Sequence, residues 1–106
     1  MITATFDADK MKLTIKGHAE CVPGETMSVV CASVSTLFYS AIYSFKQLEK
    51  KELKKFTYKD NKGDGYVCCE GGEKYDTTVK LVFWTVLNGL EAISKAYPEY
   101  LKFISQ

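Results

Sequence analysis

The spacing of the apolar residues changes along this chain, and the change constrains the fold more than any other feature. Within residues 2–15, apolar residues alternate with polar ones in two runs that flank the polar stretch 7–10. Alternation with a period of two predicts two half-buried strands joined in a hairpin. Apolar residues then recur every three or four positions and predict a long amphipathic helix; they are Val34, Leu37, Phe38, Ala41, Ile42, Phe45 and Leu48.

The second half of the chain repeats this order of patterns. Short strand-like runs at 56–58 and 66–70 flank residues 59–65, which are rich in Asp, Asn and Gly and predict a turn. Asp76 is a good N-cap for a second helix. The apolar stripe of that helix is Val79, Val82, Phe83, Val86, Leu90 and Ile93. After Pro98, residues 99–104 predict a short final turn or helix.

These elements predict a single α+β domain over residues 1–106. Their order is ββαββα, which predicts a small antiparallel sheet packed against two main helices. A length of 106 residues is sufficient for one core that needs no disulfide or metal to be stable.

The charge of the chain argues against several classes of partner. Its 14 basic and 13 acidic residues leave a formal net charge of +1, and all the basic residues are Lys. This balance gives no electrostatic reason to expect direct contact with nucleic acid. No run of 18 apolar residues is present, so we expect no membrane span. The absence of Arg also weakens any phosphate-binding interpretation.

The four cysteines could form disulfides, bind zinc or remain free thiols. The N-terminus lacks a basic segment followed by an apolar one, so we expect no secretory signal and a reduced, cytoplasmic protein. Zinc could be held by His18, Cys21, Cys31 and the pair Cys68–Cys69. Structural zinc sites favour Cys-x-x-Cys spacing, which the sequence lacks, so we expect no metal and no cofactor. Cys68 and Cys69 fit a strand, one facing the core and one facing outward.

His18 and Cys31 are the best candidates for chemistry. His18 follows the second predicted strand, Cys31 lies at the predicted start of the first helix, and a loop of roughly a dozen residues joins them. Unpaired N–H groups at a helix N-terminus favour the thiolate form of a cysteine, and a neighbouring imidazole can accept the thiol proton. The same spacing also fits an ordinary small core residue at Cys31. The spacing alone leaves both interpretations open.

Three short motifs resemble the ribosomal-processing cysteine protease family Prp. They are Gly17-His18-Ala19, the segment Val29-Val30-Cys31-Ala32-Ser33-Val34-Ser35, and the C-terminal Asn88-Gly89-Leu90-Glu91 with Tyr97-Pro98-Glu99-Tyr100. The resemblance implies a homodimeric cytoplasmic endopeptidase that removes an N-terminal extension from a large-subunit ribosomal protein. It implies His18 as the general base, Cys31 as the nucleophile, Gly17 as the hinge of a mobile loop and Ser35 as a residue lining the site.

Two departures from the family pattern bear on activity. The family usually has Asp three residues before the cysteine, where this chain has Ser28. The loop carries Cys21, Pro23 and Glu25 and is one residue longer than is usual. A carboxylate there could orient the histidine or hold a basic substrate, and we expect the Ser28 hydroxyl to do either less well. The alternative function is therefore a non-catalytic module of the same fold that binds a ribosomal protein or assists ribosome assembly.

Overall fold

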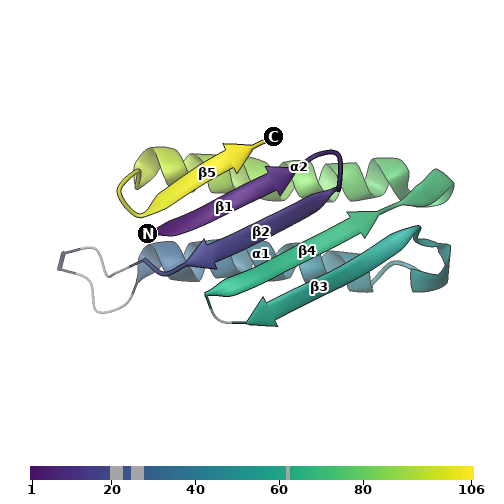
Figure 1. The fold of residues 1–106 in the computed structure, drawn as a ribbon, viewed down its shortest axis with the longest axis horizontal. Helices are drawn as coiled ribbons and strands as arrows, with labels where there is room; N and C mark the ends of the chain where they lie inside the picture. Colours follow the sequence, from purple (N-terminus) through teal and green to yellow (C-terminus); the bar gives the residue numbers. More distant parts are fainter. Residues whose placement is uncertain (20–22, 25–27, 62) are drawn as a thin grey trace.

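The computed structural model describes residues 1–19, 23–24, 28–61 and 63–106. A five-stranded sheet forms one layer, and the two long helices pack behind one of its faces (Figure 1). In chain order the elements are β1 (Ile2–Asp7), β2 (Lys12–Gly17), α1 (Val29–Lys46), the short 3-10 helix η1 (Lys50–Glu52), β3 (Lys55–Asn61), β4 (Asp64–Glu70), α2 (Gly72–Ala96) and β5 (Leu101–Ser105). The predicted α+β class and the order ββαββα are confirmed.

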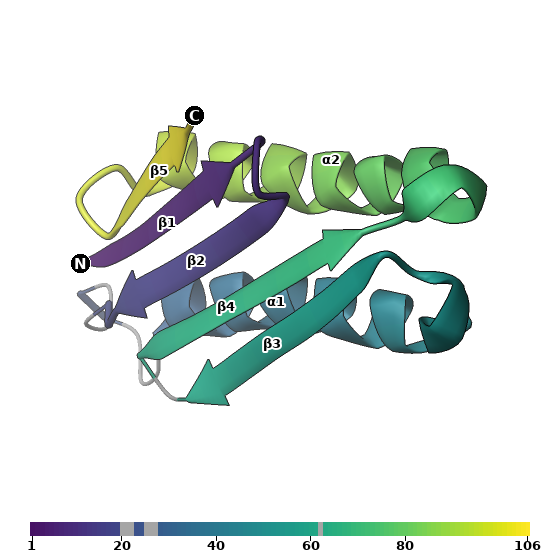
Figure 2. The same ribbon diagram turned by 45° about the vertical axis from the view of Figure 1, so that its right-hand side comes forward.

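The first hairpin lies at the centre of the sheet. The strands are arranged β3-β4-β2-β1-β5, so β2 pairs with β1 on one side and β4 on the other, both antiparallel. The burial pattern of β1 alternates, with Ile2, Ala4 and Phe6 facing the helices. Figure 2 shows α2 behind the β1–β5 side of the sheet and α1 behind the β4–β3 side. The predicted hairpin is therefore correct, and its second strand is the central strand of the sheet.

The last segment corrects the prediction of a final turn or helix at 99–104. It forms β5, which pairs parallel with β1 in the register Ile2 with Leu101 and Ala4 with Phe103. Leu101 is 1% exposed and Lys102 is exposed, so this short run also follows a period of two. The sheet is consequently mixed, because β5 is parallel to its neighbour while the other pairs are antiparallel.

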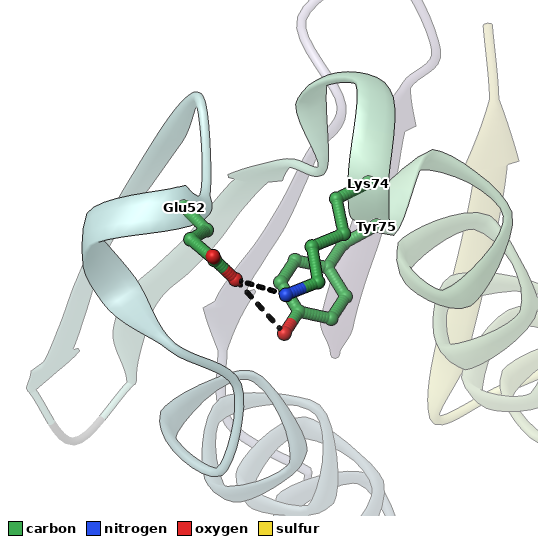
Figure 3. Close-up of polar contacts among 3 residues, drawn as sticks. All are labelled: Glu52, Lys74 and Tyr75. Atoms are coloured by element: carbon green, nitrogen blue, oxygen red, sulfur yellow. Dashed lines mark hydrogen bonds and ion pairs between the residues drawn. The ribbon is translucent and has the colours of Figure 1, made fainter.

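The second helix begins earlier than predicted, and Asp76 is not its N-cap. Gly71 occupies the cap position without a side-chain hydrogen bond, and Asp76 lies inside α2 in an ion pair with Lys80. The first turn is held by tertiary contacts instead: Glu52 accepts a hydrogen bond from Lys74 Nζ at 2.6 Å and from Tyr75 Oη at 3.3 Å (Figure 3). The Lys74 ammonium lowers the pKa of the Glu52 carboxyl. These contacts link the first turn of α2 to η1.

The strands of the second hairpin are longer than predicted. They extend through most of the predicted turn at 59–65, and the pairing of Asn61 with Asp64 leaves only residues 62 and 63 between them. Residue 62 lies outside the described part of the chain. Gly63 has a φ of +77°, a conformation that glycine adopts at little cost. The tight turn brings the hairpin end close to the end of β2.

Aromatic side chains fill the space between the sheet and the helices. The ring of Phe83 on α2 lies 5.0 Å from the rings of both Phe6 on β1 and Phe45 on α1. All three are at most 6% exposed, so they join the sheet to both helices. Within the described residues α1 alone is long and apolar enough to cross a membrane, with a mean hydropathy of 1.2 over 18 residues. Its buried residues, which include Val34, Phe38 and Phe45, belong to this core.

We expect Phe83→Ala to lower the free energy of unfolding by about 3–5 kcal/mol, because it removes the ring shared by the sheet and both helices. Thr78→Ala on the exposed side of α2 is the matched control and should change stability by less than about 0.5 kcal/mol. Urea denaturation followed by circular dichroism measures both. Equal stability of the two variants would contradict this account of the core.

Candidate active site

The N-terminus of α1 presents Cys31 as predicted. Ser28 has an extended conformation and its Oγ accepts the N–H of Cys31 at 3.1 Å, which makes it the N-cap of the helix. A Ser hydroxyl is among the side chains best suited to this position, and an Asp carboxylate can make the same bond. Ser28 therefore supports the site by holding the backbone of Cys31.

The Cys31 sulfur is engaged by the backbone of Ala19. The N–H of Ala19 donates to Sγ at 3.2 Å, and the thiol donates to the carbonyl oxygen of Ala19 at 3.4 Å. Ala19 is 7% exposed and belongs to the hydrophobic core, so this backbone is well packed. The two contacts join the helix start to the residue that follows His18, and thus bring the two predicted functional segments together.

The position of His18 follows from the close packing of Gly17 at the end of β2. Gly17 has a φ of +93°, and a Cβ at this position would lie 2.3 Å from the carbonyl oxygen of Met1. Gly17 also donates its N–H to the carbonyl oxygen of Gly63 at 2.9 Å. The chain leaving β2 is thus held between β1 and the β3–β4 turn, and His18 emerges beside that turn.

One pocket of about 350 Å³ brings most of the candidate residues together. Gly17, His18, Cys31 and Ser35 all line it, with Ser35 one helical turn after Cys31. Among the described residues, no hydrogen bond joins His18 to Cys31. The remaining lining residues come from β1, β2, α1 and the second hairpin; they are Ile2, Ile15, Val34, Phe38, Tyr39, Asp60, Asn61, Gly63, Asp64 and Gly65.

The second hairpin supplies residues that the sequence reasoning did not assign to the site. Asp60, Asn61, Gly63 and Asp64 form one wall of the pocket. A hydrogen bond from Lys59 lowers the pKa of Asp64, and the lysine ammonium lies 2.9 Å from its carboxylate. The turn-forming composition of residues 59–65 was the available signal. It indicated the hairpin but not that the hairpin end faces His18.

The other cysteines differ from Cys31 in their surroundings. Cys69 belongs to the core, as predicted. Cys68 lies on the other face of the sheet, but it is only 3% exposed and its thiol donates to the carbonyl oxygen of Lys10 at 3.2 Å. Burial raises the pKa of both thiols, that of Cys69 to about 12. Cys21 and Glu25, which the loop was expected to contribute, lie outside the described residues. Within the described part of the chain, no cluster of three or more His, Cys, Asp or Glu residues could hold a metal ion.

Comparison with known proteins identifies one family. The family described as "Cysteine protease Prp" matches residues 1–102. No curated protein sequence matches the chain significantly. The family match bears on the whole fold, because it spans every element except the end of β5.

Solved structures resemble the chain over its full length. The ribosomal processing protease Prp from S. aureus with a covalently linked product peptide has a TM-score of 0.74 at 21% identity, and the match covers 100% of both chains. The same protease with a substrate peptide has a TM-score of 0.67 at 17% identity, covering 99% and 97%. SMU.848 from Streptococcus mutans has a TM-score of 0.64 at 21% identity, covering 99% and 93%. At these identities the similarity shows the fold alone.

We expect Ser28→Ala to lower the free energy of unfolding by about 1 kcal/mol, because it removes the N-cap of α1. Ser28→Asp should retain the wild-type stability, since a carboxylate can cap the same N–H. Thermal or urea unfolding at neutral pH measures both variants. If Ser28→Ala were as stable as the wild type, Ser28 would not be supporting the helix start.

Proposed function

The chain belongs to the cysteine protease Prp family, and from this membership we propose that it is an endopeptidase that removes the N-terminal extension of a large-subunit ribosomal protein. The observation that carries the proposal is the pocket shared by Cys31 and His18, with the thiol at the start of a helix. The S. aureus relative is described as a ribosomal processing protease in complex with substrate and product peptides, which supports this class of substrate.

In the proposed reaction Cys31 is the nucleophile and His18 the general base. The thiol proton leaves its hydrogen bond with the Ala19 carbonyl and passes to His18, so the thiolate can form a bond to the scissile carbonyl carbon. Catalytic hydrogen bonds commonly tighten only when substrate is bound. His18 then protonates the leaving amine as the C–N bond breaks, and a water activated by His18 hydrolyses the thioester and restores the thiol.

The tetrahedral intermediate needs hydrogen-bond donors beside the sulfur. The Cys31 N–H is already bonded to Ser28 while the cap is in place. The Ala19 N–H donates to Sγ at 3.2 Å. In this proposal it donates to the oxyanion instead once the sulfur is bonded to the carbonyl carbon. In this proposal Gly17 sets the path of the backbone that carries both His18 and Ala19, and Ser35 contributes to the wall that contacts the peptide.

The capping role of Ser28 also bears on the alternative function. The loss of the usual family carboxylate was the main argument for a non-catalytic module. Because Ser and Asp both cap helices well, the exchange leaves the backbone of Cys31 supported. As far as the helix start is concerned, Ser28 therefore does not favour the non-catalytic alternative over proteolysis.

Peptide cleavage tests the proposed activity. The wild type should cleave a synthetic peptide that carries the N-terminal extension of a bacterial large-subunit ribosomal protein. Cys31→Ala and His18→Ala should each be slower by at least about 10²-fold, because they remove the nucleophile and the base. Cys68→Ala, a thiol on the opposite side of the sheet, should retain activity. Mass spectrometry of the products would refute the proposal if the wild type and both site variants behaved alike.

We further propose a cytoplasmic homodimer that binds neither membrane nor nucleic acid directly. Free thiols at Cys31, Cys68 and Cys69 suit a reducing compartment, and cell fractionation tests the location. Leu81 and Trp84 on α2 are 59% and 61% exposed, which is unusual for large apolar side chains. The groove beside Leu81 extends onto α1 at Ser40 and Ser44. This helical face is the proposed dimer interface.

We expect sedimentation velocity to detect a dimer in the wild type and a monomer in the double variant Leu81→Asp, Trp84→Asp, because two charges would be buried in an apolar interface. Thr57→Asp on the outward face of the edge strand β3 is the control and should stay dimeric. A wild type that is monomeric at micromolar concentration, or a double variant that remains dimeric, would contradict the proposed interface.

A further inference from the structure

The β3–β4 turn lies directly against the side chain of His18. A Cβ built on Gly63 would lie 2.3 Å from Nε2 of His18 and 2.6 Å from its Cε1. These are much shorter than van der Waals contacts, so the imidazole occupies the volume that any other residue at position 63 would fill. Gly63 comes from a hairpin far along the chain from His18, and the contact is a tertiary one.

The backbone around this contact is held in place. Gly63 accepts the N–H of Gly17 at 2.9 Å, which continues the pairing between β2 and β4 by one position beyond Lys16 and Asp64. Gly63 also has a φ of +77°, so the turn itself requires a residue that tolerates this conformation. The conformation of the turn and the nearby imidazole therefore each require glycine at position 63.

We propose that Gly63 is a positioning residue for the proposed catalytic base, and that its missing side chain determines where the His18 imidazole can lie. The inference rests on the proposed function. The atoms that a methyl group at position 63 would meet belong to the far end of an exposed side chain. The imidazole would therefore move, while the backbone of the turn would remain where it is.

Gly72 provides a matched control for the strain at a positive φ. It has a φ of +66°, and the nearest atom to a Cβ there, in Lys54, is at an ordinary 3.6 Å. Gly72 begins α2, outside the set of residues that line the pocket. Gly63→Ala and Gly72→Ala thus impose the same kind of backbone strain, but only the first displaces His18.

Steady-state cleavage kinetics compare the two variants. We expect Gly63→Ala to lower kcat by about 10²-fold with little change in KM, because the three atoms nearest to the added methyl group all belong to the His18 imidazole, so the base is what it misplaces. Gly72→Ala should retain kcat, and the two variants should unfold at similar temperatures. If Gly63→Ala has the kcat of Gly72→Ala or a higher one, the proposal is overturned.

Cleavage by both glycine variants in the His18→Ala background separates an effect on the position of His18 from general damage to the site. Without an imidazole at position 18, adding Gly63→Ala should reduce the residual cleavage no more than adding Gly72→Ala does. A further 10²-fold loss on adding Gly63→Ala would mean that Gly63 acts on something other than His18, and would overturn the proposal.

An NMR measurement tests the contact without relying on proteolysis. His18 is the only histidine in the chain, so its ring Hε1 gives a single signal. We expect a nuclear Overhauser effect between this proton and the Gly63 Hα, and a shift of the signal in Gly63→Ala but not in Gly72→Ala. Absence of both effects overturns the positioning role. If the effects are present and the wild type cleaves no peptide, the proposed function fails and the contact stands.

Discussion

The site depends on the pairing of β2 with strands on both sides. Because β1 and β4 hold it along its length, the end of β2 has one position relative to the sheet, and Gly17 lies there between the Met1 carbonyl and Gly63. The aromatic core sets α1 against the same sheet, so the start of the helix arrives next to the end of the strand. Cys31 and His18 are neighbours because of these two rigid elements, even though the loop between them is long.

The hydrogen bonds of the Cys31 sulfur are those of a neutral thiol. Within the described part of the chain, the hydrogen-bond partners of the sulfur are two backbone groups of Ala19, one donating to it and one accepting from it. A neutral thiol satisfies both groups, whereas a thiolate would keep only the N–H bond. The step from thiol to thiolate would therefore free the Ala19 carbonyl, and in the proposed reaction the imidazole accepts the proton. The chemistry proposed for this protein thus begins when the hydrogen bond between the Cys31 thiol and the Ala19 carbonyl is lost and the proton passes to His18.

Local patterns predicted the parts of the fold that depend on local physics. The alternation in residues 2–15 and the helical spacing after Val34 are properties of single elements, and both elements formed as predicted. The start of α2 was missed because Gly71 caps it without a side chain while Glu52 and Lys74, distant in sequence, hold its first turn. The role of Gly63 was missed for the same reason. A turn glycine is visible in the sequence, but the imidazole that lies against it follows the other hairpin.

The parallel pairing of β5 with β1 has a consequence for how the chain assembles. These strands form a register of Ile2 with Leu101, which is among the longest sequence separations in the molecule. The hairpins need only short loop closures, so β1 has its antiparallel partner early and its parallel partner late. Until β5 docks, the outer edge of β1 presents unpaired N–H and C=O groups to any other strand in solution. In the interval before the last strand adds to the first, β1 is therefore an additional open edge through which the chain can aggregate.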